Sequence, residues 1–96
     1  MSERSMAGTI RDPKVIKQLT DRLRRIEGQA RGIQRMLEEG RSCEEIVTQL
    51  SALRNAVNKV AAQVIVENLE ACISDENPEM DPMDALQEAK RLFLRL

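Results

Sequence analysis

The sequence predicts an all-α protein, and three observations support this. Apolar residues recur at spacings of three and four over two long stretches, which is the periodicity of an amphipathic helix. Capping residues precede each expected helix, and no segment alternates apolar and polar residues as a strand would. The 96 residues include a single aromatic side chain, Phe93, so the core is aliphatic and thin. Such a core favours a helical bundle completed by oligomerisation.

The first helix is expected over about residues 13–39, after a polar tail over residues 1–11. Asp12 supplies an N-cap acceptor, and Pro13 suits the first helical position. Gly40 is a natural C-terminal stop. The expected apolar side comprises Val15, Ile16, Leu19, Leu23, Ile26, Ala30, Ile33 and Leu37.

The second helix is expected over residues 43–73. Ser42 is its N-cap, and Glu45 three residues later completes a capping box. A link this short between two helices forces them into an antiparallel hairpin. We interpret two apolar stripes on this helix as core that contacts the first helix and a partner chain. The first consists of Ile46, Leu50, Leu53, Val57, Val60 and Val64, and the second of Val47, Ala61, Ile65 and Leu69.

The third helix is expected over about residues 82–95, after an acidic loop that follows Ile73. Asp81 and Pro82 repeat the combination of a cap and a proline. We expect Leu86, Ala89, Leu92 and Phe93 to point inward. The three helices would form a single domain over residues 12–96.

The only two cysteines, Cys43 and Cys72, lie near opposite ends of the second helix. Their 29-residue separation returns them to within about 20° of the same helix face but places them about 43 Å apart. Two copies of this helix packed antiparallel, crossing near Val57 and Asn58, would bring Cys43 of one chain beside Cys72 of the other. Alternatively, both cysteines simply pack as small apolar residues.

Several classes of chemistry are excluded. The chain has no histidine, so Ser/His and Cys/His catalysis and imidazole metal ligation are impossible. No phosphate-binding glycine loop is present, and we expect neither an enzyme nor an organic cofactor. No apolar run is long enough for a membrane span or a signal peptide, which predicts a cytoplasmic protein. In a reducing compartment, two thiols are more often redox or metal-binding groups than a structural disulfide.

The surroundings of the two thiols differ. Cys43 occupies the first turn of its helix, where the helix dipole and nearby Arg41 favour a thiolate. Acidic residues around Cys72 disfavour one. We therefore expect Cys43 to be the nucleophile and Cys72 the resolving thiol. With the Asn68 amide one turn before Cys72, the site suits sulfur chemistry or linear Cu(I) better than nickel, cobalt or zinc.

The charge of the chain is unevenly distributed. Residues 1–41 carry ten basic and six acidic side chains, whereas residues 42–96 carry five basic and ten acidic ones. A basic first helix on a protein of net charge −1 predicts an anionic partner addressed by one face, and nucleic acid is the best candidate. No helix-turn-helix signature is present. The expected DNA contacts are Arg22, Arg24, Arg25, Arg31, Arg54 and Lys59.

These residues also carry a family resemblance. The segment RLRRIEGQARGIQRM at residues 22–36, then Cys43, then TQLSALRNAVNKVA at residues 48–61, resembles the CsoR/RcnR family of bacterial metal- and stress-sensing repressors. The resemblance implies a three-helix protomer, an antiparallel helical-hairpin dimer and a disc-shaped dimer of dimers. It also implies binding to operator DNA, which a ligand at the dimer interface releases.

The resemblance further implies where the inducer binds. In copper sensors of the family, the metal site resembles a cysteine of one chain that faces a histidine and a cysteine, one turn apart, on the partner chain. The corresponding residues here are Cys43, Asn68 and Cys72. Ser42 replaces a frequent tyrosine, and Glu88 matches an outer-shell acid. Two cysteines without the histidine resemble the CstR branch, the CsoR-like sulfurtransferase repressors, whose cysteines form di- or polysulfide links with reactive sulfur species.

We therefore expect a repressor that senses persulfides or polysulfides through Cys43 and the partner's Cys72. The alternative is a Cu(I)-sensing repressor that uses the same two cysteines. A third reading, of a different class, is a helical scaffold that binds no DNA and whose cysteines only pack.

Overall fold

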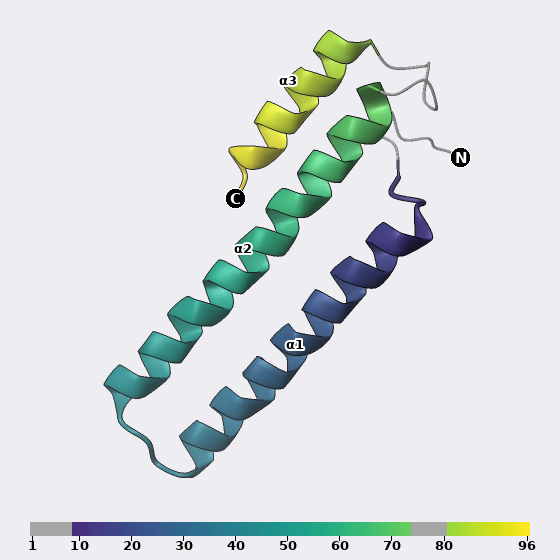
Figure 1. The fold of residues 1–96 in the computed structure, drawn as a ribbon. Helices are drawn as coiled ribbons and strands as arrows, with labels where there is room; N and C mark the ends of the chain where they lie inside the picture. Colours follow the sequence, from purple (N-terminus) through teal and green to yellow (C-terminus); the bar gives the residue numbers. More distant parts are fainter. Residues whose placement is uncertain (1–8, 74–80) are drawn as a thin grey trace, which may run out of the picture.

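The computed structural model describes residues 9–73 and 81–96 as three helices and no strand, which confirms the all-α prediction for these residues (Figure 1). They are α1 (Pro13–Glu38), α2 (Cys43–Ile73) and α3 (Pro82–Phe93). Each helix begins at its predicted residue, and the ends of α1 and α3 come one and two residues earlier than predicted. The expected loop after Ile73 and most of the expected tail lie outside the described residues.

The ends of α1 are set by its sequence. The Lys14 N–H donates to Asp12 Oδ1 at 3.0 Å, so Asp12 is the expected N-cap. At the other end, Gly40 has a φ of 74°, a left-handed conformation that side chains disfavour. The Arg41 N–H donates to the Met36 carbonyl at 3.0 Å, and the Gly40 N–H donates to the Leu37 carbonyl at 3.2 Å. Together these bonds form a Schellman motif, which turns the chain sharply out of α1.

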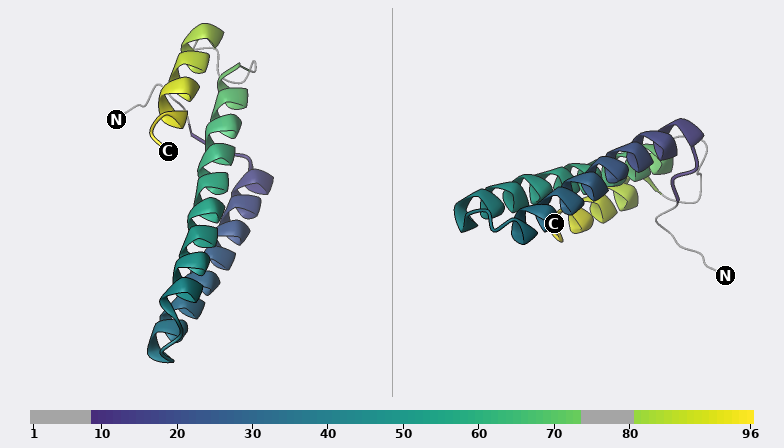
Figure 2. Two further views of the ribbon diagram at one scale, coloured as in Figure 1. Left: turned by 90° about the vertical axis from the view of Figure 1, so that its left-hand side faces the viewer. Right: turned by 90° about the horizontal axis from the view of Figure 1, so that it is seen from below.

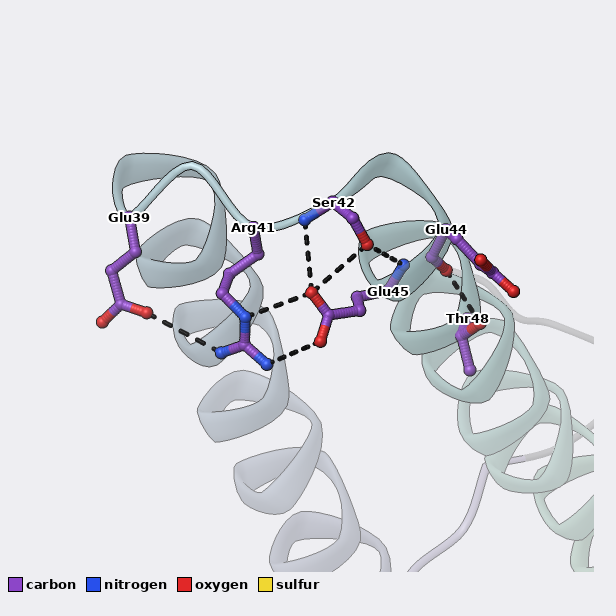
Figure 3. A network of polar contacts seen from close by, with 6 residues as sticks. All are labelled: Glu39, Arg41, Ser42, Glu44, Glu45 and Thr48. Carbon is purple, nitrogen blue, oxygen red and sulfur yellow. Dashed lines mark hydrogen bonds and ion pairs between the residues drawn. The ribbon is translucent and has the colours of Figure 1, made fainter.

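The capping box at the start of α2 is present as predicted (Figure 3). The Glu45 N–H donates to Ser42 Oγ, and the Ser42 N–H donates to Glu45 Oε1, both at 3.2 Å. A helix stop and a helix start therefore follow one another within four residues. As a result, α1 and α2 form an antiparallel hairpin and lie side by side in every view (Figures 1 and 2).

The hairpin closes along a narrow buried seam. Leu19 and Ile33 of α1 and Val60 of α2 are buried. These side chains occupy the strip where the two helices meet, and they define the direction in which each helix faces the other.

The third helix packs along the C-terminal half of α2 and does not contact α1 (Figures 1 and 2). Ala85 and Ala89 are 2% and 5% exposed, and Leu69 of α2 packs against Ala85. Leu69 therefore contacts α3, a neighbour that the prediction for its stripe did not include. The prediction was wrong for Leu86 and Phe93, which are 44% and 43% exposed because the two alanines take the inward face.

Candidate thiol site and basic groove

The helix α2 carries both cysteines. Cys43 is its first residue and is an exposed free thiol. Cys72 is its penultimate residue, and the helix is continuous over all 31 residues. At 1.5 Å per residue the two positions are about 43 Å apart, so they cannot react with each other inside one chain. A single chain therefore does not bring the two cysteines together.

Between the two cysteines, α2 exposes apolar side chains in heptad steps. Leu50, Val57 and Val64 are 46%, 44% and 38% exposed, whereas Val60 beside them is buried against α1. Only part of the first predicted core stripe is thus covered within one chain. The helix α1 exposes apolar residues in the same seven-residue register, on the same side of the seam. We call the six exposed residues the apolar face: Ile16, Leu23, Leu37, Leu50, Val57 and Val64.

A polar network surrounds the Cys43 end of α2 (Figure 3). The Arg41 guanidinium binds Glu45 through two hydrogen bonds, at 2.9 Å and 3.2 Å, and lies 3.8 Å from a Glu39 carboxylate oxygen. The hydrogen bond from Arg41, and after it the one from the Ser42 backbone, lowers the pKa of Glu45 from 4.5 to about 2. Two carboxylates thus balance the charge of Arg41.

The residues expected to line the thiol site lie in three places: just before α2, near the end of α2, and on α3. Ser42 serves as the cap beside Cys43. Asn68 is half-buried at the other end of α2, one turn before Cys72. Glu88 lies on α3, where it accepts a hydrogen bond from Arg91. Within the described part of one chain, no three histidine, cysteine or acidic side chains cluster as metal ligands would.

A second feature lies on the other side of the hairpin, between α1 and α2. It is a groove of about 450 Å³, which we call the basic groove. Its polar lining consists of Arg22, Arg25, Gln29, Asn55 and Lys59, and its floor of Ile26, Ala52, Ala56 and Val60. Three cations line it, and no carboxylate does.

The groove contains only three of the six predicted DNA-contacting cations. Arg24 lies outside it, 3.7 Å from Asp21, which also pairs with Lys17 at 3.0 Å. Arg31 and Arg54 do not line it either. Arg54 precedes Lys59 by five residues, which places the two about 140° apart around α2.

Sequence reasoning missed Gln29 and Asn55. The signal was available, because Gln29 follows Arg22 by seven residues and Asn55 precedes Lys59 by four, so each shares a helix side with a groove cation.

The part of the chain that the structure describes contains no helix long and apolar enough to cross a membrane.

Three known proteins are similar to this chain over most of its length. The copper-sensing transcriptional repressor CsoR of Bacillus subtilis is 40% identical over 76 residues, which cover 79% of this chain and 75% of that protein. The copper-sensing transcriptional repressor RicR of Mycobacterium tuberculosis is 44% identical over 77 residues, which cover 78% of this chain and 80% of that protein. The solved structure of the nickel-responsive transcriptional regulator InrS superposes with a TM-score of 0.68 at 30% identity, covering 99% of this chain and 96% of that one.

The family comparison covers most of the chain. The sequence profile described as metal-sensitive transcriptional repressor matches residues 16–95. The transcriptional repressor RcnR of Salmonella typhimurium is 33% identical over 93 residues, 94% of this chain and all of that protein. CsoR, RicR and RcnR are all named as repressors, and CsoR and RicR are named as copper sensors. These relatives give the CstR branch no support. The chain belongs to the CsoR/RcnR family of metal-sensitive transcriptional repressors, whose members are not enzymes.

Proposed function

We propose that the protein is a DNA-binding repressor that works as an assembly of antiparallel homodimers and reads its inducer with Cys43 of one chain and the partner's Cys72. One observation carries this proposal. An exposed thiol begins α2, an exposed apolar stripe follows it, and the second cysteine lies in the last turn of the same helix.

The occupant of the apolar face is a second copy of the chain. The face has a seven-residue register on both helices, as helices packed lengthwise require, and its six members are aliphatic. A two-fold axis near Val57 makes the face self-complementary, because Leu50 of one chain then lies opposite the partner's Val64. The same axis brings Cys43 next to the partner's Cys72 at both ends of the dimer. Pairing of two such dimers would give the expected disc-shaped tetramer.

The first candidate inducer is an organic or inorganic persulfide. The Cys43 thiolate attacks the outer sulfur of RSSH, which forms a Cys43 persulfide and releases the thiol RSH. The partner's Cys72 thiolate then attacks the inner sulfur of that persulfide, which forms a disulfide and releases hydrogen sulfide. The two cysteines are oxidised by two electrons and the persulfide is reduced by two. If both cysteines first become persulfides, the same exchange leaves a trisulfide.

The second candidate inducer is Cu(I), which the named relatives favour because two of them are copper-sensing repressors. Two thiolates suffice for linear coordination of this soft ion. Ser42, Asn68 and Glu88 would line the site with either inducer, and their neutral or acidic side chains add no soft ligand.

The basic groove is the first candidate for contact with DNA phosphates, and Arg24, Arg31 and Arg54 are additional candidates. Arginine and lysine side chains neutralise phosphates, and amides such as Gln29 and Asn55 add hydrogen bonds to them. Release would follow when the crosslink or the metal fixes the two α2 helices in an arrangement that no longer fits DNA.

The test uses an operator duplex selected from a random-sequence pool. The protein is treated separately with an organic persulfide and with Cu(I), and both DNA binding and intact mass are measured. Release by the persulfide, with a crosslinked dimer whose mass shows a disulfide or a link with one or more added sulfur atoms, supports the first inducer. Release by Cu(I) alone supports the second.

Two variants make this test specific. Cys43→Ser should abolish response and crosslink together, whereas Cys72→Ser should still accept a persulfide on Cys43 without forming the crosslink. If the wild type binds the duplex and neither treatment releases it, the thiol-sensing part of the proposal is wrong. If it binds no duplex at all, only the helical scaffold remains.

A further inference from the structure

We propose that the assembled repressor holds two DNA duplexes at once, on two opposite faces, and so bridges separate DNA segments. This inference rests on the proposed function, because it requires that the apolar face joins two copies and that the basic groove contacts DNA. It follows from the positions of these two surfaces on opposite sides of the hairpin.

On α1, each surface lies on its own side of the seam. The groove residue Arg22 and the apolar-face residue Leu23 are consecutive, so they point about 100° apart. The direction between them is taken by the buried seam residue Leu19, whose side chain points at α2.

On α2 the separation is larger. The groove residue Lys59 and the apolar-face residue Val57 lie about 160° apart around the helix. The buried Val60 lies between them and faces α1. Both helices therefore place the cations of the basic groove on one side of the α1–α2 plane and the residues of the apolar face on the other.

Joining two copies through their apolar faces consequently turns their basic grooves outward, in opposite directions. Two stacked layers of helices are about 20 Å thick. The screening length is about 10 Å at 0.1 M salt, so phosphates on one face repel those on the other only weakly. A single straight duplex cannot reach both grooves of one dimer, because the dimer itself lies between them.

Each groove carries its own complement to phosphate. None of Arg22, Arg25 and Lys59 forms an ion pair with another residue that the structure describes, whereas Arg24 shares Asp21 with Lys17. Three cations without an ion pair correspond to a salt dependence of about −2.7 in log K against log salt for each groove. Occupation of one groove leaves the other unchanged, and the free groove is then available to a second duplex.

The experiment is a two-duplex capture assay at about 0.1 M salt, where the screening length is about 10 Å. One biotinylated random-sequence duplex is held on beads, a fluorescent duplex is added in solution, and the full-length protein is titrated. We expect protein-dependent capture of the fluorescent duplex that rises, passes through a maximum and falls when excess protein occupies each duplex separately. Anisotropy with the fluorescent duplex alone measures single-duplex binding in parallel.

Matched variants separate bridging from other causes. Lys59→Glu should lose both single-duplex binding and capture, whereas Lys90→Glu, with the same charge change on α3, should lose neither. Val57→Asp, in which the apolar face is disrupted, should keep weak single-duplex binding and lose capture.

Each outcome decides the matter. Tight single-duplex binding without capture overturns bridging and leaves the proposed DNA binding intact. Capture that rises steadily without a maximum, or that persists in Val57→Asp, shows aggregation instead and also overturns bridging. If no duplex binds even alone, both the inference and the proposed DNA binding are wrong.

Discussion

Replacing Val57 with aspartate should dissociate the proposed dimer without unwinding the hairpin. Val57 is 44% exposed in the single chain and lies at the centre of the apolar face. Full burial of such a side chain contributes about 1.5–3 kcal/mol, so burial of the exposed fraction contributes about 0.7–1.3 kcal/mol per chain. An aspartate buried without a polar partner costs at least about 1–3 kcal/mol more. Because the two-fold axis places one substitution on each chain, both contributions count twice. The total is at least about 3.4 kcal/mol, which raises the dimer dissociation constant at least about 300-fold.

Sedimentation equilibrium over a concentration series measures this constant, and circular dichroism checks that the helices persist. Ser51→Asp is the matched control, because Ser51 is exposed and lies about 120° from Val57 around α2. Val57→Ala provides a milder step in the same direction that is expected to keep the fold. If the Val57→Asp constant stays within about tenfold of the wild-type value while Ser51→Asp behaves identically, the apolar face is not the dimer interface.

Three further predictions concern the hairpin turn and the groove. Gly40→Ala should lower stability in thermal melts by about 1–2 kcal/mol because of its positive φ, whereas Gly28→Ala, with open space around its added methyl group, should gain up to about 1 kcal/mol. The pKa of Glu45 is about 2 in the folded chain and 4.5 ordinarily, so its stabilisation is complete above pH 4.5 and is lost as the pH falls toward 2; melts of Glu45→Gln should lack this component. Lys59→Ala should reduce the salt slope of DNA binding by about 0.9, and an equal change in Lys90→Ala would contradict the groove assignment.

Much of the fold could be predicted because local signals coincide with it. Asp12, Gly40 and the Ser42–Glu45 pair each act on backbone groups within a few residues, so their effect does not depend on tertiary structure. Periodicity located the long apolar stripes on α1 and α2 for the same reason. Periodicity could not show which residues of these stripes pack within the same chain and which are left for a second chain.

The rest depends on which helices meet. The inward side of α3 is set by close approach of Ala85 and Ala89 to α2, a small-residue contact that apolarity ranks below Leu86 and Phe93. Charge counting identified the basic helix but not the division of its cations. Which cations line the groove depends on how α1 and α2 pack in the hairpin. This packing places Arg22 and Arg25 of α1 beside Lys59 of α2 and leaves Arg54 outside the groove.

The unbroken course of α2 has a consequence for the tolerated length of this segment. Both cysteine positions belong to the same helix, so deleting one residue between them turns one relative to the other by 100° and shortens their separation by 1.5 Å. In a two-fold antiparallel pair, that single change would misalign the thiols at both ends of the dimer at once. A dimer of this kind therefore fixes the number of residues between Cys43 and Cys72.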